Sequence, residues 1–368
     1  MSDRIRVVHI VYSLGMGGVE TIVSSICSNM DPERFDVHII SFSDHTPLYE
    51  KMIDRDQVKL HTLGREYPMK DWHAPLKAEW RLWKTLKKID PDLIHGHIYY
   101  VDHLLMAYLL GKPHVLTFHG PSMNSFRNRL RQQVTRWCNN LRENASRTVC
   151  VSQSTRRYIA EHFHDNYSSV SVVRNGVDTS FFAPINAPKA KIKRIGNISR
   201  QVSGKGLETL IEAWGTLSGN DPSLSLQLAG NGNLQKELKM AAEKRPNGNI
   251  DFLGETSDPK RFIEGQDLLV FPSEHEGLPM APLEVMSMGI PILLSDIPPH
   301  REIAGDFADH LLFKTGDAKS LISGIQRWLQ LSPGEREVWS QHLRNRIQEE
   351  FSLTGTVQGY QDLYQQWA

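Results

Sequence analysis

Short apolar, β-branched runs recur along the chain between amphipathic stretches of about ten or more residues. This alternation is typical of strands and helices in a parallel sheet. In the first half of the chain it predicts strands at 4–11, 36–42, 57–63, 92–97, 113–118, 147–152 and 170–174. Beyond a turn signal at Asn175-Gly176, it predicts further strands at 192–198, 224–229, 249–254, 267–273, 291–296 and 310–313.

The turn at Asn175-Gly176 and the polar stretch after it predict a domain junction. A length of 368 residues also exceeds what one core usually serves. We therefore expect two doubly wound, Rossmann-like α/β domains, over residues 1–176 and 177–368, that face each other across a cleft. A last amphipathic segment at about 356–367 is expected to be a helix that packs back toward the first domain.

Composition and charge indicate the class of protein and its compartment. The chain is 40% hydrophobic with 42 basic and 42 acidic residues, which is typical of a globular protein. A basic excess in residues 1–180 suggests an anionic partner for that half, although chance explains it equally well. Three cysteines without close spacing favour a reducing compartment, and no apolar run suits a signal peptide or a membrane span. We expect a cytoplasmic protein.

Ligands of open α/β sheets bind beyond the carboxyl ends of the strands, so binding residues are expected just after the predicted strands. After the first predicted strand, Gly17-Gly18 lies in a glycine loop that opens a helix and lets phosphates approach backbone amides. The spacing is not that of the dinucleotide fingerprint, because Glu20 stands where its third glycine would fall. A tight strand-to-helix turn is the alternative interpretation.

Two cations follow the first strand of the second domain. Arg200 and Lys205 lie in one loop before the predicted helix that starts at Leu207. Arginine can bind two phosphate oxygens while lysine acts as a point charge, so the pair suits a diphosphate leaving group. A solvated loop is an equally good interpretation of these two residues taken alone.

The segment with the most candidate binding residues is Ser273 to Glu284, after the predicted strand that ends near Phe271. Seven residues separate Glu276, in a loop, from Glu284, near a helix start. The helix start offers amides to phosphate, Glu284 can accept hydrogen bonds from ribose hydroxyls, and Glu276 faces the sugar. The backbone of the loop between them is a further candidate contact: Gly277, Leu278, Pro279 and Met280.

At this point the chain resembles the retaining glycosyltransferases of family 4, which have the two-domain GT-B fold. The resemblance covers nearly the whole chain. It rests on these motifs: Gly17-Gly18, Asn175-Gly176-Val177-Asp178, Arg200, Lys205-Gly206, the Glu276-to-Glu284 spacing and Gly289-Ile-Pro291. The chain departs from many members at Pro279 and Val285, which leaves the donor sugar open.

The resemblance implies roles for the candidates. Arg200, Lys205, Gly17 and Gly18 would bind the donor diphosphate, Glu284 the ribose and Glu276 the transferred sugar. It further implies a donor domain at residues 177–368 and an acceptor domain at 1–176. The reaction would move a hexosyl group from a nucleoside diphosphate sugar, UDP favoured and GDP possible, to a hydroxyl of a lipid-linked glycan in surface-polysaccharide synthesis.

His119 and His97 each end a predicted strand at the same edge, and in similar enzymes the position of His119 faces the donor sugar. We assign His119 to catalysis, leave His97 open and expect His95 to be structural. Asp54-Arg-Asp56 and Asp90-Pro-Asp92 resemble metal-binding motifs but precede strands. We therefore expect no metal and no cofactor, with Arg200, Lys205 and the helix start doing the work of an ion.

A basic amphipathic helix is expected at 126–142. It can lie on the inner face of an anionic cytoplasmic membrane, or it can pack on the core with a solvated basic face. No partner of the nucleic-acid class is indicated. The alternative functions are another GT-B enzyme, such as a phosphorylase or a nucleotide-sugar epimerase, and a catalytically silent nucleotide-sugar-binding protein.

Overall fold

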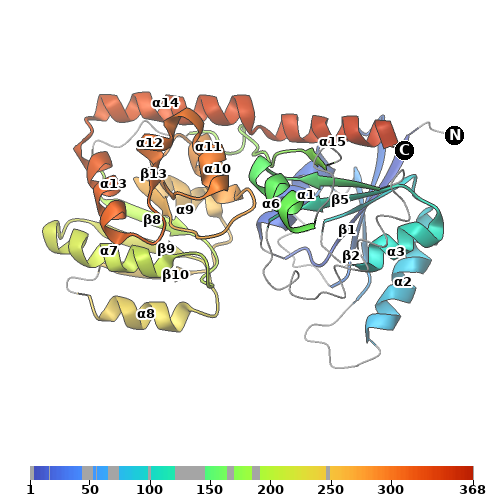
Figure 1. Ribbon diagram of the computed structural model, residues 1–368, viewed down its shortest axis with the longest axis horizontal. Helices are drawn as coiled ribbons and strands as arrows, with labels where there is room; N and C mark the ends of the chain where they lie inside the picture. The colour runs from blue at the N-terminus through green and yellow to red at the C-terminus, as the bar shows by residue number, and fades with distance from the viewer. Residues whose placement is uncertain are drawn as a thin grey trace. The chain divides into compact units, whose positions relative to one another are not determined.

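The computed structural model describes residues 4–15, 17–43, 53–54, 56–64, 74–97, 101–120, 146–163, 170–184, 191–245 and 249–367. The chain forms two compact units (Figure 1). The first unit comprises Met1–Asn175 together with Leu353–Ala368, and the second comprises Gly176–Ser352. The first unit is therefore discontinuous in sequence.

A seven-stranded parallel sheet, ordered β3-β2-β1-β4-β5-β6-β7, is the centre of the first unit. Its strands are β1 (Ile5–Val11), β2 (Phe35–Ser41), β3 (Val58–Thr62), β4 (Leu93–Gly96), β5 (His114–Phe118), β6 (Ser146–Cys150) and β7 (Val170–Val172). The helices of this unit include α1 (Gly18–Ser28), α2 (Ala74–Ile89), α3 (Val101–Leu110), α6 (Gln153–Phe163) and α15 (Leu353–Trp367).

The second unit repeats this design on a six-stranded parallel sheet, ordered β10-β9-β8-β11-β12-β13. Its strands are β8 (Arg194–Ile198), β9 (Ser225–Ala229), β10 (Ile250–Gly254), β11 (Leu268–Phe271), β12 (Ile292–Ser295) and β13 (Leu312–Phe313). Its helices are α7 (Leu207–Asn220), α8 (Gln235–Glu243), α9 (Pro259–Gly265), α10 (Met280–Ser287), α11 (Pro298–Ala304), α12 (Ala308–Leu311), α13 (Ala318–Gln330) and α14 (Pro333–Glu350), with a 3₁₀ turn, η3, at Gly305–Phe307.

Every strand predicted from the apolar runs is present, so the doubly wound α/β prediction is confirmed for both units. The strand order reverses between β1 and β4 in the first sheet and between β8 and β11 in the second. These are the topological switch points, where the loops after neighbouring strands diverge and leave room for a ligand. The sequence candidates follow strands at or next to these points.

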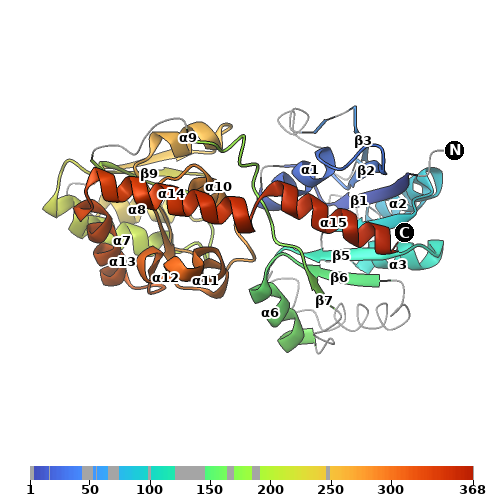
Figure 2. The ribbon, with the colours of Figure 1, turned by 90° about the horizontal axis from the view of Figure 1, so that it is seen from above.

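Helix α15 packs on the first unit beside α1 (Figure 2). The side-chain carbonyl of Gln361 accepts a 2.9 Å hydrogen bond from the backbone N–H of Asp31. The ring of Tyr364 packs edge-on against Phe35, and Tyr360 is also fully buried. Aromatic burial of this size attaches the helix firmly to the sheet.

The core of each unit is apolar where helices cover the sheet. In the first unit, Leu82 and Leu86 of α2 pack into one cluster with Val8 and Ile40 of the strands. Among the described residues, no helix is both long and apolar enough to cross a membrane.

Candidate functional site

Two loops meet at the switch point of the second unit. β8 and β11 are parallel neighbours, so their carboxyl ends lie side by side. The loop after β8 carries Arg200 and Lys205, and the loop after β11 carries Glu276. The sheet thus brings together candidates that are more than seventy residues apart in sequence.

The two loops are joined through their backbones. The N–H of Glu274 donates a 2.8 Å hydrogen bond to the carbonyl of Gly204. Gly206 has a φ of 64°, and a Cβ at this position would lie 2.0 Å from the carbonyl oxygen of Pro272. A side chain does not fit such a contact, and L residues rarely adopt this φ. Glycine at position 206 is therefore what lets the two loops touch.

Lys205 and Glu276 form an ion pair. Nζ of Lys205 donates a 2.6 Å hydrogen bond to Oε1 of Glu276, and the two side chains are 19% and 14% exposed. Charge-assisted bonds of this length are strong and hold both groups in one orientation. The structure therefore places one cation and one carboxylate of the sequence prediction in direct contact.

Arg200 lies on the exposed side of the same loop, and its guanidinium makes no hydrogen bond or ion pair within the described part of the chain. Its backbone is held by the loop after β9. A Cβ on Gly230 would lie 2.0 Å from the carbonyl oxygen of Ser199, and one on Gly232 would lie 2.1 Å from that of Gln201. The sequence analysis did not select these two glycines, although Gly-x-Gly directly after a strand is the signal for them.

Glu284 is a buried carboxylic acid in the second turn of α10. It is 8% exposed, and among the described residues its carboxyl group makes no hydrogen bond or ion pair. Burial raises the pKa of Glu284 to about 7, because an apolar environment disfavours the charged form. Hydrogen-bond donors on a ligand would favour the charged form and lower this pKa again.

The segment from Gly277 to Met280 connects the ion pair to α10. Leu278 and Met280 are buried, and Pro279 has extended backbone angles immediately before the helix begins at Met280. The backbone of this segment thus enters the amino end of α10, where helix amides favour an anion.

His300 is a buried histidine that the sequence analysis missed. It lies on α11 after β12, and its Nδ1 is 2.8 Å from the carbonyl oxygen of Ser295. Its Nε2 is buried without a hydrogen-bond partner in the described structure. Burial lowers the pKa of His300 to about 4, with the nearby Glu276 charge acting against this shift. The imidazole is therefore neutral, and its place just after a strand end is the signal that could have found it.

In the first unit, His119 ends a chain of buried imidazoles. Nε2 of His119 is 3.1 Å from Nδ1 of His97, and Nε2 of His97 is 2.9 Å from Nδ1 of His9. Burial lowers the pKa of His119 to about 4 and that of His9 to about 3, so both rings are neutral. Nδ1 of His119 is buried and makes no hydrogen bond within the described ranges.

Helix α15 completes this chain. The hydroxyl of Tyr364 lies 2.5 Å from Nδ1 of His95 and 3.4 Å from Nε2 of His9. The hydroxyl of Thr117 contacts both Nε2 of His95 and the hydroxyl of Tyr360, at 2.8 and 3.0 Å. We call this set the histidine–tyrosine network: His119, His97, His9, His95, Tyr364, Thr117 and Tyr360.

Ring nitrogens of His9, His95 and His97 all lie within 4.8 Å of one another, which is close enough to consider a metal ion. Imidazole is a good ligand for zinc and similar ions. Here, however, these nitrogens bond to one another and to hydroxyl groups, so hydrogen bonds alone account for their arrangement.

Gly17 is the residue before α1, and its φ of −176° is open to any residue. A Cβ there would approach the end of the Glu20 side chain, which is flexible. Gly18 is the first residue of α1. Local backbone geometry therefore does not require glycine at position 17, so a role for it depends on a ligand.

Both Asp-x-Asp sequences precede strands, as expected. Asp54 and Asp56 come before β3, whereas Asp90 and Asp92 come before β4. Asp90 is exposed and pairs with Lys112 at 2.8 Å. The expected basic helix at 126–142 lies outside the described residues.

Comparisons with known proteins agree with this architecture. Residues 16–181 match the family model described as glycosyltransferase family 4, and residues 178–346 match that of the glycosyl transferases group 1. A galactosyltransferase of Escherichia coli, named UDP-Gal:alpha-D-GlcNAc-diphosphoundecaprenol alpha-1,3-galactosyltransferase, is 26% identical over 98% of this chain and 97% of its own length. An uncharacterized glycosyltransferase of Haemophilus influenzae is 21% identical over 91% of this chain and 95% of its own.

Solved structures show the same fold. The crystal structure of Anabaena HepE in complex with UDP-glucose superposes with a TM-score of 0.82 and 15% identity, over 99% of this chain and 100% of that one. The two matched family segments together cover residues 16–346. The chain therefore belongs to the family 4 type of glycosyltransferases and has the GT-B fold.

Proposed function

We propose that this glycosyltransferase moves a hexosyl group from a nucleoside diphosphate sugar to a hydroxyl of a lipid-linked glycan, with retention of anomeric configuration. A UDP-sugar is the favoured donor and a GDP-sugar the second candidate. The E. coli relative is named for a UDP-galactose donor and a diphosphoundecaprenol-linked acceptor, and Anabaena HepE was crystallised with UDP-glucose. Surface-polysaccharide synthesis on the inner face of the cytoplasmic membrane fits such an acceptor.

The observation that carries the donor assignment is the pairing of Lys205 with Glu276 on the loop that leads to Glu284. A diphosphate would draw Lys205 toward its oxygens, with Arg200 beside it on the same loop. Glu276 would then accept hydrogen bonds from sugar hydroxyls. Glu284, a buried carboxyl group without a partner in the described structure, would receive those of the ribose.

The chemistry follows from the charges. Bond cleavage at the anomeric carbon leaves negative charge on the diphosphate, and fixed cations with the amino end of α10 stabilise it. We expect no divalent metal, because Arg200 and Lys205 supply the neutralising charge. In our proposal the acceptor attacks on the face that the diphosphate leaves, and a departing phosphate oxygen takes the acceptor proton. We also assign to His119, which burial keeps as a neutral imidazole, a role in contacting the donor sugar.

Thermal stabilisation by sugar nucleotides tests the donor assignment. A ligand that binds only the folded state adds about 2.7 kcal/mol at a concentration of one hundred times Kd. UDP-hexoses should raise the melting temperature of the wild type, and chelation of divalent ions should not reduce the shift. If no sugar nucleotide raises it, the proposed donor class is wrong.

Glu284→Gln provides the matched variant, since it keeps the shape of the side chain and removes the charge. It should weaken UDP-sugar binding more than binding of inorganic pyrophosphate, because pyrophosphate has no ribose. Equal weakening of both would place Glu284 away from the ribose. Release of UDP in the presence of an undecaprenyl-diphosphate-linked sugar then reports transfer itself.

A further inference from the structure

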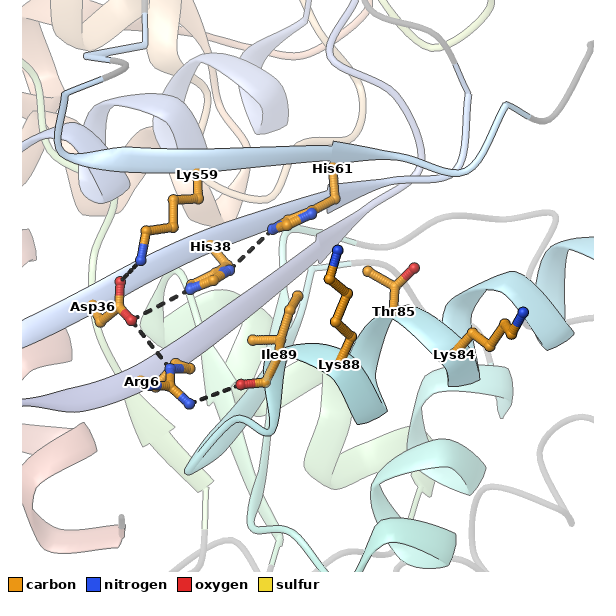
Figure 3. Close-up of a pocket in the computed structure, with 9 residues that line it drawn as sticks. All are labelled: Arg6, Asp36, His38, Lys59, His61, Lys84, Thr85, Lys88 and Ile89. Carbon is orange, nitrogen blue, oxygen red and sulfur yellow. Dashed lines mark hydrogen bonds and ion pairs between the residues drawn. The ribbon is translucent and has the colours of Figure 1, made fainter.

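An open pocket of about 670 Å³ lies in the first unit, between the sheet and the last turns of α2 (Figure 3). It is lined by Arg6, Asp36, His38, Lys59, His61, Lys84, Thr85, Lys88 and Ile89. Arg6, Asp36 and Lys59 are near the amino ends of β1, β2 and β3. The candidate donor-site residues follow the carboxyl ends of strands, so this pocket is a separate feature.

The polar residues of the pocket that come from the strands lie on a sheet face whose other residues belong to the hydrophobic core. Val8 and Ile40 lie on the same strands, two residues from Arg6 and His38, and pack under α2. Polar groups on such a face cost free energy unless they are paired or bind a ligand. His38 is 6% exposed, and its Nε2 makes no hydrogen bond in the described structure, with the nearest carboxylate oxygen, of Asp36, 3.5 Å away.

Cations outnumber anions in the pocket by three, since four basic side chains face one carboxylate. Burial acts to raise the pKa of Asp36, but the bonds from Lys59 and Arg6, at 2.8 and 3.1 Å, outweigh it and lower this pKa to about 2. Lys88 makes no ion pair within the described ranges, and its charge helps to lower the pKa of His61. The lining therefore carries positive charge that no carboxylate of the pocket neutralises.

The two histidines form a proton-sharing pair. Nδ1 of His38 lies 3.0 Å from Nε2 of His61, and the planes of the two rings are 2° apart, so the rings are nearly parallel and meet through these nitrogen atoms. Burial lowers the pKa of both, and for His38 the charge of Asp36 acts in the opposite direction. An anion in the pocket would favour one added proton on the pair, because opposite charges stabilise each other.

We propose that this pocket is a second ligand site that binds a phosphate- or diphosphate-bearing molecule, apart from the donor site. Its volume suits a small ligand rather than a single ion. Lys88 of α2 and Lys59 of β3 supply positive charge from two elements (Figure 3), and the His38–His61 pair adds a further charge as it takes up a proton. The ligand is either a soluble phosphate compound or the headgroup of an anionic lipid.

Calorimetric titration with inorganic pyrophosphate tests the site. A Lys205→Ala background weakens the donor site, so the result does not depend on the proposed function. In that background, Lys88→Ala should weaken pyrophosphate binding by about fivefold or more. The matched control is Lys87→Ala, which removes the same charge one residue away, where the ammonium group lies over the ring of Trp83 and outside the pocket lining.

Sulfate binding tests the histidine pair, because the charge of sulfate stays constant over the pH range in which histidine titrates. Any change of sulfate affinity with pH then reports protonation of the protein. Sulfate affinity should rise as the pH falls through this range, as the His38–His61 pair becomes charged beside Arg6, Lys59, Lys84, Lys88 and Asp36. A His38→Gln, His61→Gln double variant should lose this rise.

Sedimentation with phosphatidylglycerol vesicles, against phosphatidylcholine vesicles, identifies the source of the ligand. Binding to the anionic vesicles that Lys88→Ala weakens and Lys87→Ala spares supports the site with a lipid headgroup as ligand. The proposal is overturned if neither pyrophosphate nor anionic vesicles bind, or if Lys87→Ala reduces binding as much as Lys88→Ala does.

Discussion

The two units place polar groups at their switch points in different ways. The second unit joins two loops through glycine-to-carbonyl contacts and holds charged side chains there, Lys205 and Glu276 among them. The first unit buries neutral groups, with His119 at the end of the histidine–tyrosine network. Charged groups on short, rigid loops suit a charged ligand, whereas a neutral buried network fixes orientation without adding charge.

Gly206→Ala should have the largest effect, because a Cβ would lie 2.0 Å from the carbonyl oxygen of Pro272 at a φ of 64°. We expect a loss of about 3 kcal/mol in the free energy of unfolding, measured by urea denaturation, and weaker UDP-sugar binding. Gly219→Ala in α7 is the control, since a Cβ there meets no atom within 4 Å. A Gly206→Ala variant as stable as Gly219→Ala would show that the loops do not depend on this contact.

Glu276→Ala should lower the transfer rate by about 100-fold, or ~2.7 kcal/mol in activation free energy, because it removes a group that orients both Lys205 and the sugar. Steady-state release of UDP measures this. Glu274→Ala, in the same loop with an exposed side chain, should stay within about twofold of the wild type. Similar rates for Glu276→Ala and wild type would remove Glu276 from the site.

Glu284 should make stability fall with rising pH. The pKa of Glu284 is raised by burial to about 7, above its value in the unfolded chain, so the folded state holds this proton more tightly. The resulting stability is complete below about pH 4.5 and is lost as the pH rises through about 7. As the pH rises between these limits, the free energy of unfolding of Glu284→Gln should increase by about 2 kcal/mol relative to that of the wild type. Urea denaturation across pH measures this difference. A constant difference would mean that Glu284 titrates normally.

Tyr364→Phe should give the smallest effect, a loss of about 1 to 2 kcal/mol in the free energy of unfolding. The change takes one hydroxyl from both His95 and His9. Tyr360→Phe is the graded control, since it removes the single contact to Thr117 and should cost less. If Tyr360→Phe costs as much as Tyr364→Phe, the network is not held chiefly through Tyr364.

The sheets were predictable from sequence because buried parallel strands are continuous apolar runs, as in Leu268–Phe271. The ion pair was partly predictable: both partners were selected, each for its place after a strand, but their direct contact depends on the pairing of β8 with β11. Sequence pattern fixes which strand end carries a residue, and sheet order decides which ends are neighbours.

The histidine–tyrosine network escaped prediction for the same reason. His9 and His95 are opposite each other in the register of β1 and β4, although they are 86 positions apart in the chain. Nothing in the local pattern of either strand indicates that partner. His300 also follows a strand end, that of β12, but its closeness to Glu276 exists only in the folded chain and is not contained in the spacing of the motifs.

The return of α15 to the first unit also sets an order of events during synthesis. Residues 176–352 leave the ribosome before Tyr360 and Tyr364 do. The hydrogen bonds of His95 and Thr117 to these two hydroxyl groups can therefore form only after the whole second unit has been made. The unit that is translated first is thus the one that matures last. A premature stop codon within α15 would therefore destabilise the unit that residues 1–175 form.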